Sequence, residues 1–189
     1  IRVIIPFYKV TKLGNRKRTQ IGSVLVEFDG KKERVEIFSV IHPTSHVLVY
    51  FLNNQKYLDE VRSIDTWGFF GKAIVTLLKK NKLRWIPEII HGNDVHCSYI
   101  PLILKDEKMQ IKTVLTIHNI AFQGQTDDLI IKRLGLKSNI CKVVEWEVKS
   151  RKINSLMEGI IHSDVVTTVS PTYAKEIMTP EYGELLEEL

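Results

Sequence analysis

Polar side chains that can bind ligands or move protons follow three apolar stretches of the sequence. In an open parallel sheet, ligands bind beyond the carboxyl ends of the strands. We therefore expect the side chains that follow these stretches to meet along one edge of a sheet. They are Asp94 and His96 after residues 88–91, His118 and Asn119 after residues 112–117, and Ser170 after residues 164–169.

The pair His118 and Asn119 is the most specific of these features. It is followed by Gln123 and Gly124, and glycine allows a ligand to approach the backbone closely. A polar pair that projects into a crevice predicts a ligand site. A histidine at a strand end can also be a structural, hydrogen-bonded residue, so both interpretations stay open.

His91, Asp94 and His96 have side chains that bind metals, but their spacing matches no recognised zinc pattern. We expect His91 to point away from the other two, and we predict no metal site. Asp94 is also a candidate N-cap for a helix that begins near His96. Because the N-terminus of a helix attracts anions, capping and ligand binding are compatible.

Several familiar catalytic motifs are absent. The sequence contains no GxGxxG, GxxxxGK[ST], GxSxG, HExxH or CxxC pattern. A P-loop NTPase, a typical dehydrogenase, a zincin and an α/β-hydrolase are therefore disfavoured. The two cysteines, Cys97 and Cys141, are too few for a disulfide framework and fit a reducing compartment.

The composition is that of a globular domain. The 189 residues suffice for one full-sized domain, and 44% hydrophobic with 26% charged residues exclude a collagen or a disordered chain. No apolar run reaches the roughly 18 residues that span a bilayer. The net charge of +5 favours an anionic ligand without identifying it, so nucleic acid, nucleotide-sugar phosphates and an acidic partner stay open.

The first third of the sequence is β-rich. Short β-branched runs predict strands, and Asp29-Gly30 predicts a hairpin turn between two of them. The basic segment Lys9 to Arg18 is predicted to be an exposed loop. The predicted strands are 1–6, 21–28, 34–40 and 47–52.

After Asp65 the hydrophobic period becomes helical, with Asp65 or Thr66 as the candidate N-cap of a helix that ends near Asn81. From there strands and helices alternate. This alternation predicts a parallel sheet with helices on both faces, the three-layer α/β/α arrangement of Rossmann-like domains. The predicted strands are 88–91, 112–117 and 164–169, and the predicted helices are 96–104, 127–134, 149–162 and one that begins at Pro171.

No targeting segment is visible at the start of the given sequence, and we expect none there. It begins with Ile1 inside an apolar run, and its last nine residues (181–189) hold four glutamates in a helical pattern without a stop signal. We therefore expect one domain over residues 1–189 that is truncated at both ends and belongs to a longer protein.

Three ordered segments resemble the N-terminal domain of bacterial glycogen synthases and plant starch synthases, which are retaining glycosyltransferases of the two-domain GT-B type. VLTIHNIAFQG (114–124) carries the resemblance most clearly. EIIHGNDVHCSYIPLIL (88–104) and SDVVTTVSPTYAKEI (163–177) agree with it in order and spacing. The stretches IRVIIPFY (1–8) and 49–57 also fit, so the resemblance covers nearly the whole chain.

The resemblance implies transfer of glucose from ADP-glucose or UDP-glucose to the non-reducing end of an α-1,4-glucan, without a metal ion or other cofactor. It assigns His118 to the catalytic site, beside the glucosyl unit, with Asn119 in the same wall. It places Asp94 and His96 along the cleft for sugar or acceptor, and Tyr57 at an aromatic position of the sugar site. It also implies a cytoplasmic location, or a plastid in a plant.

Two departures from the family pattern affect these expectations. Val95 stands where the family has a tryptophan, so a stacking surface for the acceptor is lost and restoring Trp is expected to tighten glucan binding. The family's Lys-Thr-Gly-Gly-Leu loop and its second, nucleotide-binding domain are not in this sequence. We therefore expect the chain taken alone to be inactive.

Two other classes of function stay open. A non-catalytic glucan-binding or regulatory half-enzyme module agrees with the Val95 departure. A nucleic-acid binder agrees with the net charge, but the sequence lacks aromatic residues interleaved with a basic stripe. We expect neither a nucleic-acid nor a membrane partner.

Overall fold

The computed structural model describes residues 1–60, 63–141 and 152–189. They form two compact units, Ile1–Ile86 and Pro87–Leu189. The expectation of one domain over residues 1–189 stays a prediction. In the described residues, no helix combines the length and the apolar character needed to cross a bilayer.

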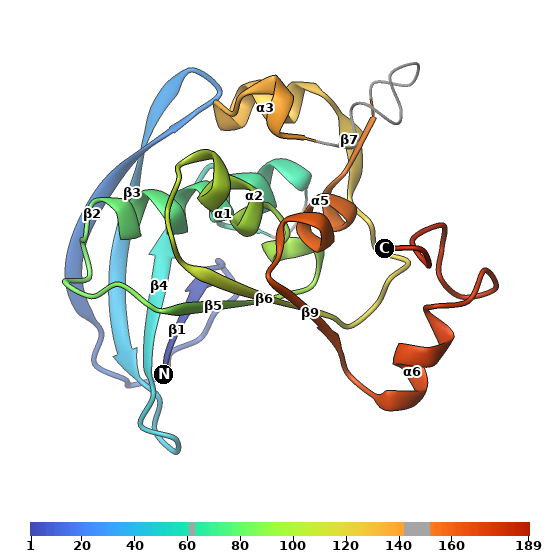
Figure 1. The fold of residues 1–189 in the computed structure, drawn as a ribbon. Coiled ribbons are helices and arrows are strands. Elements are labelled where there is room, and N and C mark those ends of the chain that lie inside the picture. The colour runs from blue at the N-terminus through green and yellow to red at the C-terminus, as the bar shows by residue number, and fades with distance from the viewer. Residues whose placement is uncertain (61–62, 142–151) are drawn as a thin grey trace. The chain divides into compact units, whose positions relative to one another are not determined.

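The first unit contains a four-stranded sheet in the order β1-β4-β3-β2 (Figure 1). β1 runs parallel to β4, and the other pairs are antiparallel. The predicted Asp29-Gly30 hairpin turn is confirmed, since both residues have the positive φ (52° and 67°) that a tight hairpin turn requires. The strands are β1 (Arg2–Pro6), β2 (Thr19–Phe28), β3 (Lys31–Ile41) and β4 (Leu48–Asn53).

Helix α1 (Ile64–Lys79) packs against β2 in the same unit. Its N-cap is Ser63, whose hydroxyl accepts a hydrogen bond from the Thr66 N–H, so the predicted caps Asp65 and Thr66 are wrong. Serine, threonine and aspartate are all good caps, and local sequence does not choose among closely spaced ones.

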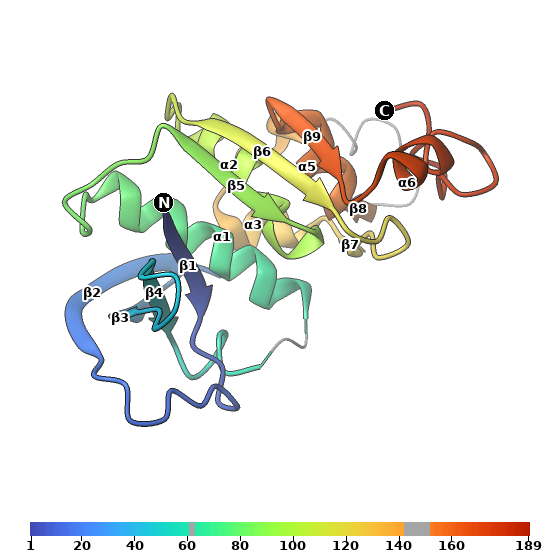
Figure 2. The ribbon, with the colours of Figure 1, turned by 90° about the horizontal axis from the view of Figure 1, so that it is seen from below.

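The second unit is built on a parallel sheet in the order β5-β6-β9. Helices α2 (Tyr99–Asp106) and α5 (Ser155–His162) contact each other and lie on the same side of this sheet (Figure 2). On β6 the residues alternate, so that Leu115 and Ile117 are buried while Thr116 is half-exposed. The strands are β5 (Ile89–Asn93), β6 (Lys112–Ile117) and β9 (Val165–Thr168).

Shorter elements complete the second unit, and several boundaries differ from the predictions. The helix expected from His96 begins as the 3-10 turn η1 and continues as α2 only from Tyr99, and the helix expected from Asp127 begins at Leu129. The short elements are η1 (Val95–Cys97), β7 (Gln125–Asp127), α3 (Leu129–Leu134), η2 (Ser138–Ile140), β8 (Lys152–Asn154) and α6 (Pro171–Glu176).

Two predicted helices are corrected more strongly. In the predicted helix 149–162, residues 149–151 lie outside the described residues, and Lys152–Asn154 forms strand β8 paired with β7. The helix begins only after Asn154, whose side chain caps it by accepting from the Met157 N–H. Residues 181–189 form turns instead of a helix. Glu184 and Leu185 have positive φ (53° and 70°), which a right-handed helix does not allow.

Candidate active site

The carboxyl ends of β5 and β6 lie side by side, and polar groups from both meet there. In the parallel register Asn93 lies opposite Thr116, and Thr116 lies opposite Thr167 of β9. Residues that follow β5 therefore reach those that follow β6. The expectation that the strand ends share one sheet edge is confirmed.

Asp94 links the ends of the two strands through its carboxylate. Its Oδ1 accepts hydrogen bonds from the backbone N–H of His118 at 2.8 Å and of Asn119 at 3.3 Å. The side chain makes no capping hydrogen bond to η1, so the interpretation of Asp94 as a capping side chain is wrong. Its backbone has φ 57° and ψ −178°, a region that costs about 1–3 kcal/mol for a residue other than glycine.

His118 and Asn119 are both exposed beyond β6. The Nε2 atom of His118 lies 3.0 Å from Oδ1 of Asn93, the last residue of β5. Asn119 turns the chain, because its side-chain oxygen accepts from the Ala121 N–H at 3.0 Å. The imidazole is thus restrained from β5 while its exposed surface stays open to solvent.

β9, the third strand of the sheet, is followed by helix α6, which contacts the loop after β6. Ser170 caps this helix by accepting from the Tyr173 N–H, and Pro171 occupies its first turn, as predicted. The Tyr173 hydroxyl then accepts from the Ile120 N–H at 2.9 Å, which ties the loop after β6 to α6. Neither Asn93 nor Tyr173 is among the site residues that the sequence predicts. For Asn93, the alternation of side chains along β5 was a usable signal.

His96 lies half-buried next to this edge. Burial lowers the pKa of its imidazole, and the nearby Asp94 carboxylate opposes that shift in part. His91 instead contacts Oγ1 of Thr116 through Nε2 at 2.6 Å. Within the described parts of the chain, no three His, Cys, Asp or Glu side chains form a group suited to a metal ion.

Val95, which stands where the family pattern has tryptophan, is buried with only 1% of its surface exposed. The position therefore presents no side chain to solvent in this structure. A stacking surface at residue 95 would require the local packing to change.

Tyr57 belongs to the first unit, where it is half-buried and its aromatic ring packs against other side chains. It stacks on Phe69 with ring centroids 4.5 Å apart and meets the edge of Phe28 at 5.1 Å. The Lys56 ammonium lies 4.6 Å from the ring centre and pairs with Glu33 at 2.8 Å. The Glu33 bond, and after it Tyr57, raises the pKa of Lys56 above its usual range.

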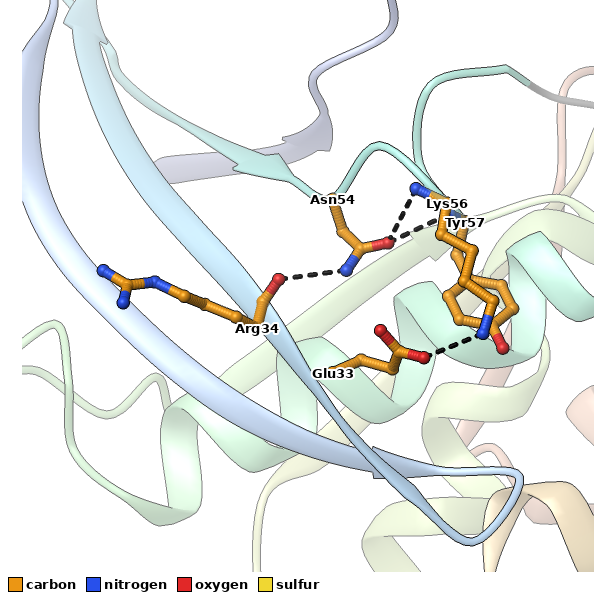
Figure 3. Close-up of polar contacts among 5 residues, drawn as sticks. All are labelled: Glu33, Arg34, Asn54, Lys56 and Tyr57. Carbon is orange, nitrogen blue, oxygen red and sulfur yellow. Dashed lines mark hydrogen bonds and ion pairs between the residues drawn. The ribbon is translucent and has the colours of Figure 1, made fainter.

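Asn54 fixes the turn that carries Tyr57 (Figure 3). Its amide donates to the Arg34 carbonyl at 2.9 Å and accepts from the N–H groups of Lys56 and Tyr57 at 3.1 and 3.0 Å. Since Asn54 is itself buried, these bonds hold the turn firmly. The sugar-site role of Tyr57 stays a prediction, and its packing favours a structural role.

Polar groups gathered beyond the carboxyl ends of parallel strands define a ligand-binding α/β protein. The family comparison is more specific: the chain belongs to the starch synthase catalytic domain family, whose model matches residues 1–189.

Individual relatives agree with this assignment. The chain is 33% identical over 199 residues to a glycogen synthase of Aquifex aeolicus and 34% identical over 207 residues to one of Lacticaseibacillus casei, covering 99% of this chain in each case. It also resembles the solved catalytic domain of starch synthase IV from Arabidopsis thaliana, bound to ADP and acarbose. That match has a TM-score of 0.87 at 26% identity and covers 99% of this chain. The chain spans 41% of the length of each of these three proteins.

Proposed function

We propose that this chain forms one wall of the active site of a retaining glucosyltransferase. The reaction is transfer of glucose from ADP-glucose, or UDP-glucose, to the non-reducing end of an α-1,4-glucan. Family membership supports the reaction class, and the ADP and acarbose bound to the Arabidopsis relative support a nucleotide donor and a glucan-like ligand. We infer that residues beyond this chain supply the nucleotide site, because the relatives are more than twice as long.

The single observation that carries the proposal is the convergence on His118. Its main chain is held by Asp94 and its imidazole by Asn93, so an exposed histidine is preorganised at the sheet edge where α/β folds bind ligands. Glycosyl transfer passes through an oxocarbenium-like state, which is stabilised by groups fixed in advance. In this role His118 would hydrogen-bond the transferred glucose, and Asn119 would line the same wall.

Replacing His118 tests the proposal. His118→Ala in the full-length protein is expected to lower kcat at least about 100-fold, as the loss of one preorganised hydrogen-bonding group does elsewhere. Because the side chain is exposed, the thermal unfolding midpoint should change little. The matched control is His91→Ala, which removes an exposed histidine from the same sheet and should leave kcat within a few-fold of wild type. Equal turnover in wild type and His118→Ala would overturn the proposal.

A second candidate is a glucan-binding or regulatory half-enzyme module without catalysis. The buried Val95 gives no stacking surface for the acceptor where the family pattern has tryptophan, which agrees with a loss of glucose transfer. Glucan affinity that is measurable in the full-length protein, together with no glucose transfer from either nucleotide sugar, would support this candidate over the enzyme.

A further inference from the structure

Asn93 contacts the side chain on which the proposed function depends. Its Oδ1 lies 3.0 Å from Nε2 of His118. We propose that Asn93 is a positioning residue that holds the His118 imidazole with its proton on Nε2, so that the lone pair of Nδ1 is left to accept a hydrogen bond from a sugar hydroxyl. This inference rests on the proposed function and specifies how the same site works.

The sheet register explains why the two side chains meet. Asn93 is paired with Thr116 across β5 and β6, and His118 follows Thr116 by two residues. Side chains two residues apart along a strand direction project to the same side, so Asn93 and His118 lie on one face. Both residues are exposed, so the hydrogen bond orients the ring without burying it.

The chemistry of the contact determines the position of the proton. In the amide orientation of this structure the oxygen of Asn93 faces the ring. Because an amide oxygen only accepts hydrogen bonds, Nε2 of His118 donates in this orientation. In a neutral imidazole the other ring nitrogen is then an acceptor. The main chain of His118 is fixed separately by Oδ1 of Asp94, the next residue after Asn93. Consecutive residues at the end of β5 thus hold the backbone and the ring of the same histidine.

His91 provides a matched control on the same strand. Its Nε2 lies 2.6 Å from the Thr116 hydroxyl, which also contacts the Thr167 hydroxyl at 2.7 Å. A hydroxyl can donate or accept, so this contact does not fix the position of the ring proton. His91 and Asn93 lie on the same face of β5. His91 and His118 are both exposed. The two imidazoles therefore differ chiefly in the kind of partner.

The direct test is imidazole ¹⁵N spectroscopy on the full-length protein with ¹⁵N-labelled histidine, at a pH where the ring is neutral. The expected result for His118 is a protonated Nε2 and an unprotonated Nδ1, and His118→Gln assigns the signals. Asn93→Leu should move both ¹⁵N shifts toward the values of a ring that exchanges between tautomers, and Asn93→Asp should preserve them. The His91 signals should stay unchanged in both variants. A proton on Nδ1 of wild-type His118 would overturn the proposal without any variant.

Turnover of the full-length protein provides the second readout. Asn93→Leu is expected to lower kcat about 10- to 100-fold through misplacement of the ring, while KM for the nucleotide sugar changes much less. Asn93→Asp should restore most of kcat, since it keeps an acceptor. In a His118→Ala background, Asn93→Leu should have no further effect, because residues that act through one another are not additive.

The two proposals fail in different ways. If His118→Ala leaves turnover unchanged, the proposed function is wrong, and the ¹⁵N spectra still decide whether Asn93 orients the ring. If His118→Ala abolishes turnover while Asn93→Leu has wild-type kcat and wild-type ¹⁵N shifts, only the positioning role is overturned.

Discussion

The family resemblance assigns sugar-site roles both to the strand-end residues of the second unit and to Tyr57 of the first unit, but the two places differ in what surrounds the side chains. His118 is exposed, and hydrogen bonds hold it at Nε2 of its ring and at its backbone N–H. Tyr57 is held through its ring, which stacks on Phe69 and lies under the Lys56 ammonium. Contacts at the edge of the imidazole leave its faces free, which suits a ligand site, whereas contacts on the face of the half-buried Tyr57 ring suit packing.

The cost of the two arrangements also differs. Asp94 has a strained backbone with φ 57°, and its carboxylate accepts two hydrogen bonds. Backbone strain of this kind persists only where the surrounding structure enforces the conformation, and it is common at functional sites. Asn54 holds the Tyr57 turn with an ordinary side-chain turn that satisfies its own buried amide. The comparison predicts that substitutions at the strand-end site mainly alter activity, whereas substitutions in the Tyr57 turn mainly alter stability.

Removing the Asp94 carboxylate should have the largest effect of the variants in this comparison. Asp94→Ala frees the N–H groups of His118 and Asn119, so we expect kcat of the full-length protein to fall about 100-fold through misplacement of the histidine. Loss of these two hydrogen bonds to a charged group should also cost about 1–3 kcal/mol of unfolding free energy. Steady-state kinetics and denaturant unfolding measure the two effects.

Two further substitutions at residue 94 separate charge from strain. Asp94→Asn keeps an accepting oxygen and should lie between wild type and Asp94→Ala in both measurements. Asp94→Gly relieves the positive φ and should be more stable than Asp94→Ala, with kcat just as low. Wild-type kcat in Asp94→Ala would show that turnover does not need the restraint of Asp94 on the His118 backbone. The predicted difference between the strand-end site and the Tyr57 turn would then be wrong.

Tyr57→Leu is expected to act on stability instead. The variant loses an aromatic stack and an edge contact, each worth about 0.5–1.5 kcal/mol beyond buried area, so we expect unfolding free energy to fall by about 1–3 kcal/mol. Tyr57→Phe keeps the ring contacts and is the matched control. We expect kcat and KM of both variants to stay near wild type. A large rise in KM for the nucleotide sugar or the glucan, with unchanged stability, would instead establish the predicted sugar-site role.

Sequence alone predicted the elements whose signals are local. β6 was predicted to the residue because Lys112–Ile117 is a β-branched run next to polar residues, and the Ser170 cap with Pro171 was equally clear. β8 was missed because its strand character comes from pairing with β7, about 25 residues earlier in the chain.

The candidate site shows the same division between local and long-range information. His118 and Asn119 were identified by their place after a predicted strand. The role of Asp94 was not, because its partners lie 24 and 25 residues away, just after a different strand. The nearby helix start also offered a plausible local explanation. The ring contacts of Tyr57 depend on residues 28 and 69, which no local pattern connects with it.

Val95→Trp tests whether residue 95 can join the exposed region. Because Val95 is buried, the larger side chain should strain the packing and cost about 1–3 kcal/mol. The sequence-based prediction that tryptophan tightens glucan binding holds only if the ring reaches the surface. Affinity electrophoresis in glucan measures this, with Val95→Phe as a control for size. Unchanged glucan affinity in a folded Val95→Trp variant would show that this position does not contact the glucan.

The smallest expected effect lies at the opposite, amino ends of β6 and β9, where Asp164 joins the two strands. Its carboxylate accepts from the Lys112 ammonium at 2.9 Å and from the Thr113 N–H and hydroxyl at 2.8 and 3.0 Å. These bonds, with Lys112 first, lower the pKa of Asp164 to about 2. An unfolded aspartate has a pKa near 4, so between these values the unfolded chain binds more protons.

The stabilisation from Asp164 is therefore fully present above about pH 4 and is lost as the pH falls toward 2. Asp164→Asn should be less stable than wild type at pH 6, and the difference in unfolding midpoint should shrink on acidification to pH 2. Because the carboxylate is close to solvent, high salt should weaken the stabilisation from the ion pair with Lys112 but not that from the hydrogen bonds with Thr113. Lys112→Met removes the ion pair alone and so measures the two contributions separately. A difference that does not depend on pH would mean that the charge of Asp164 does not help to align the strands whose far ends carry His118.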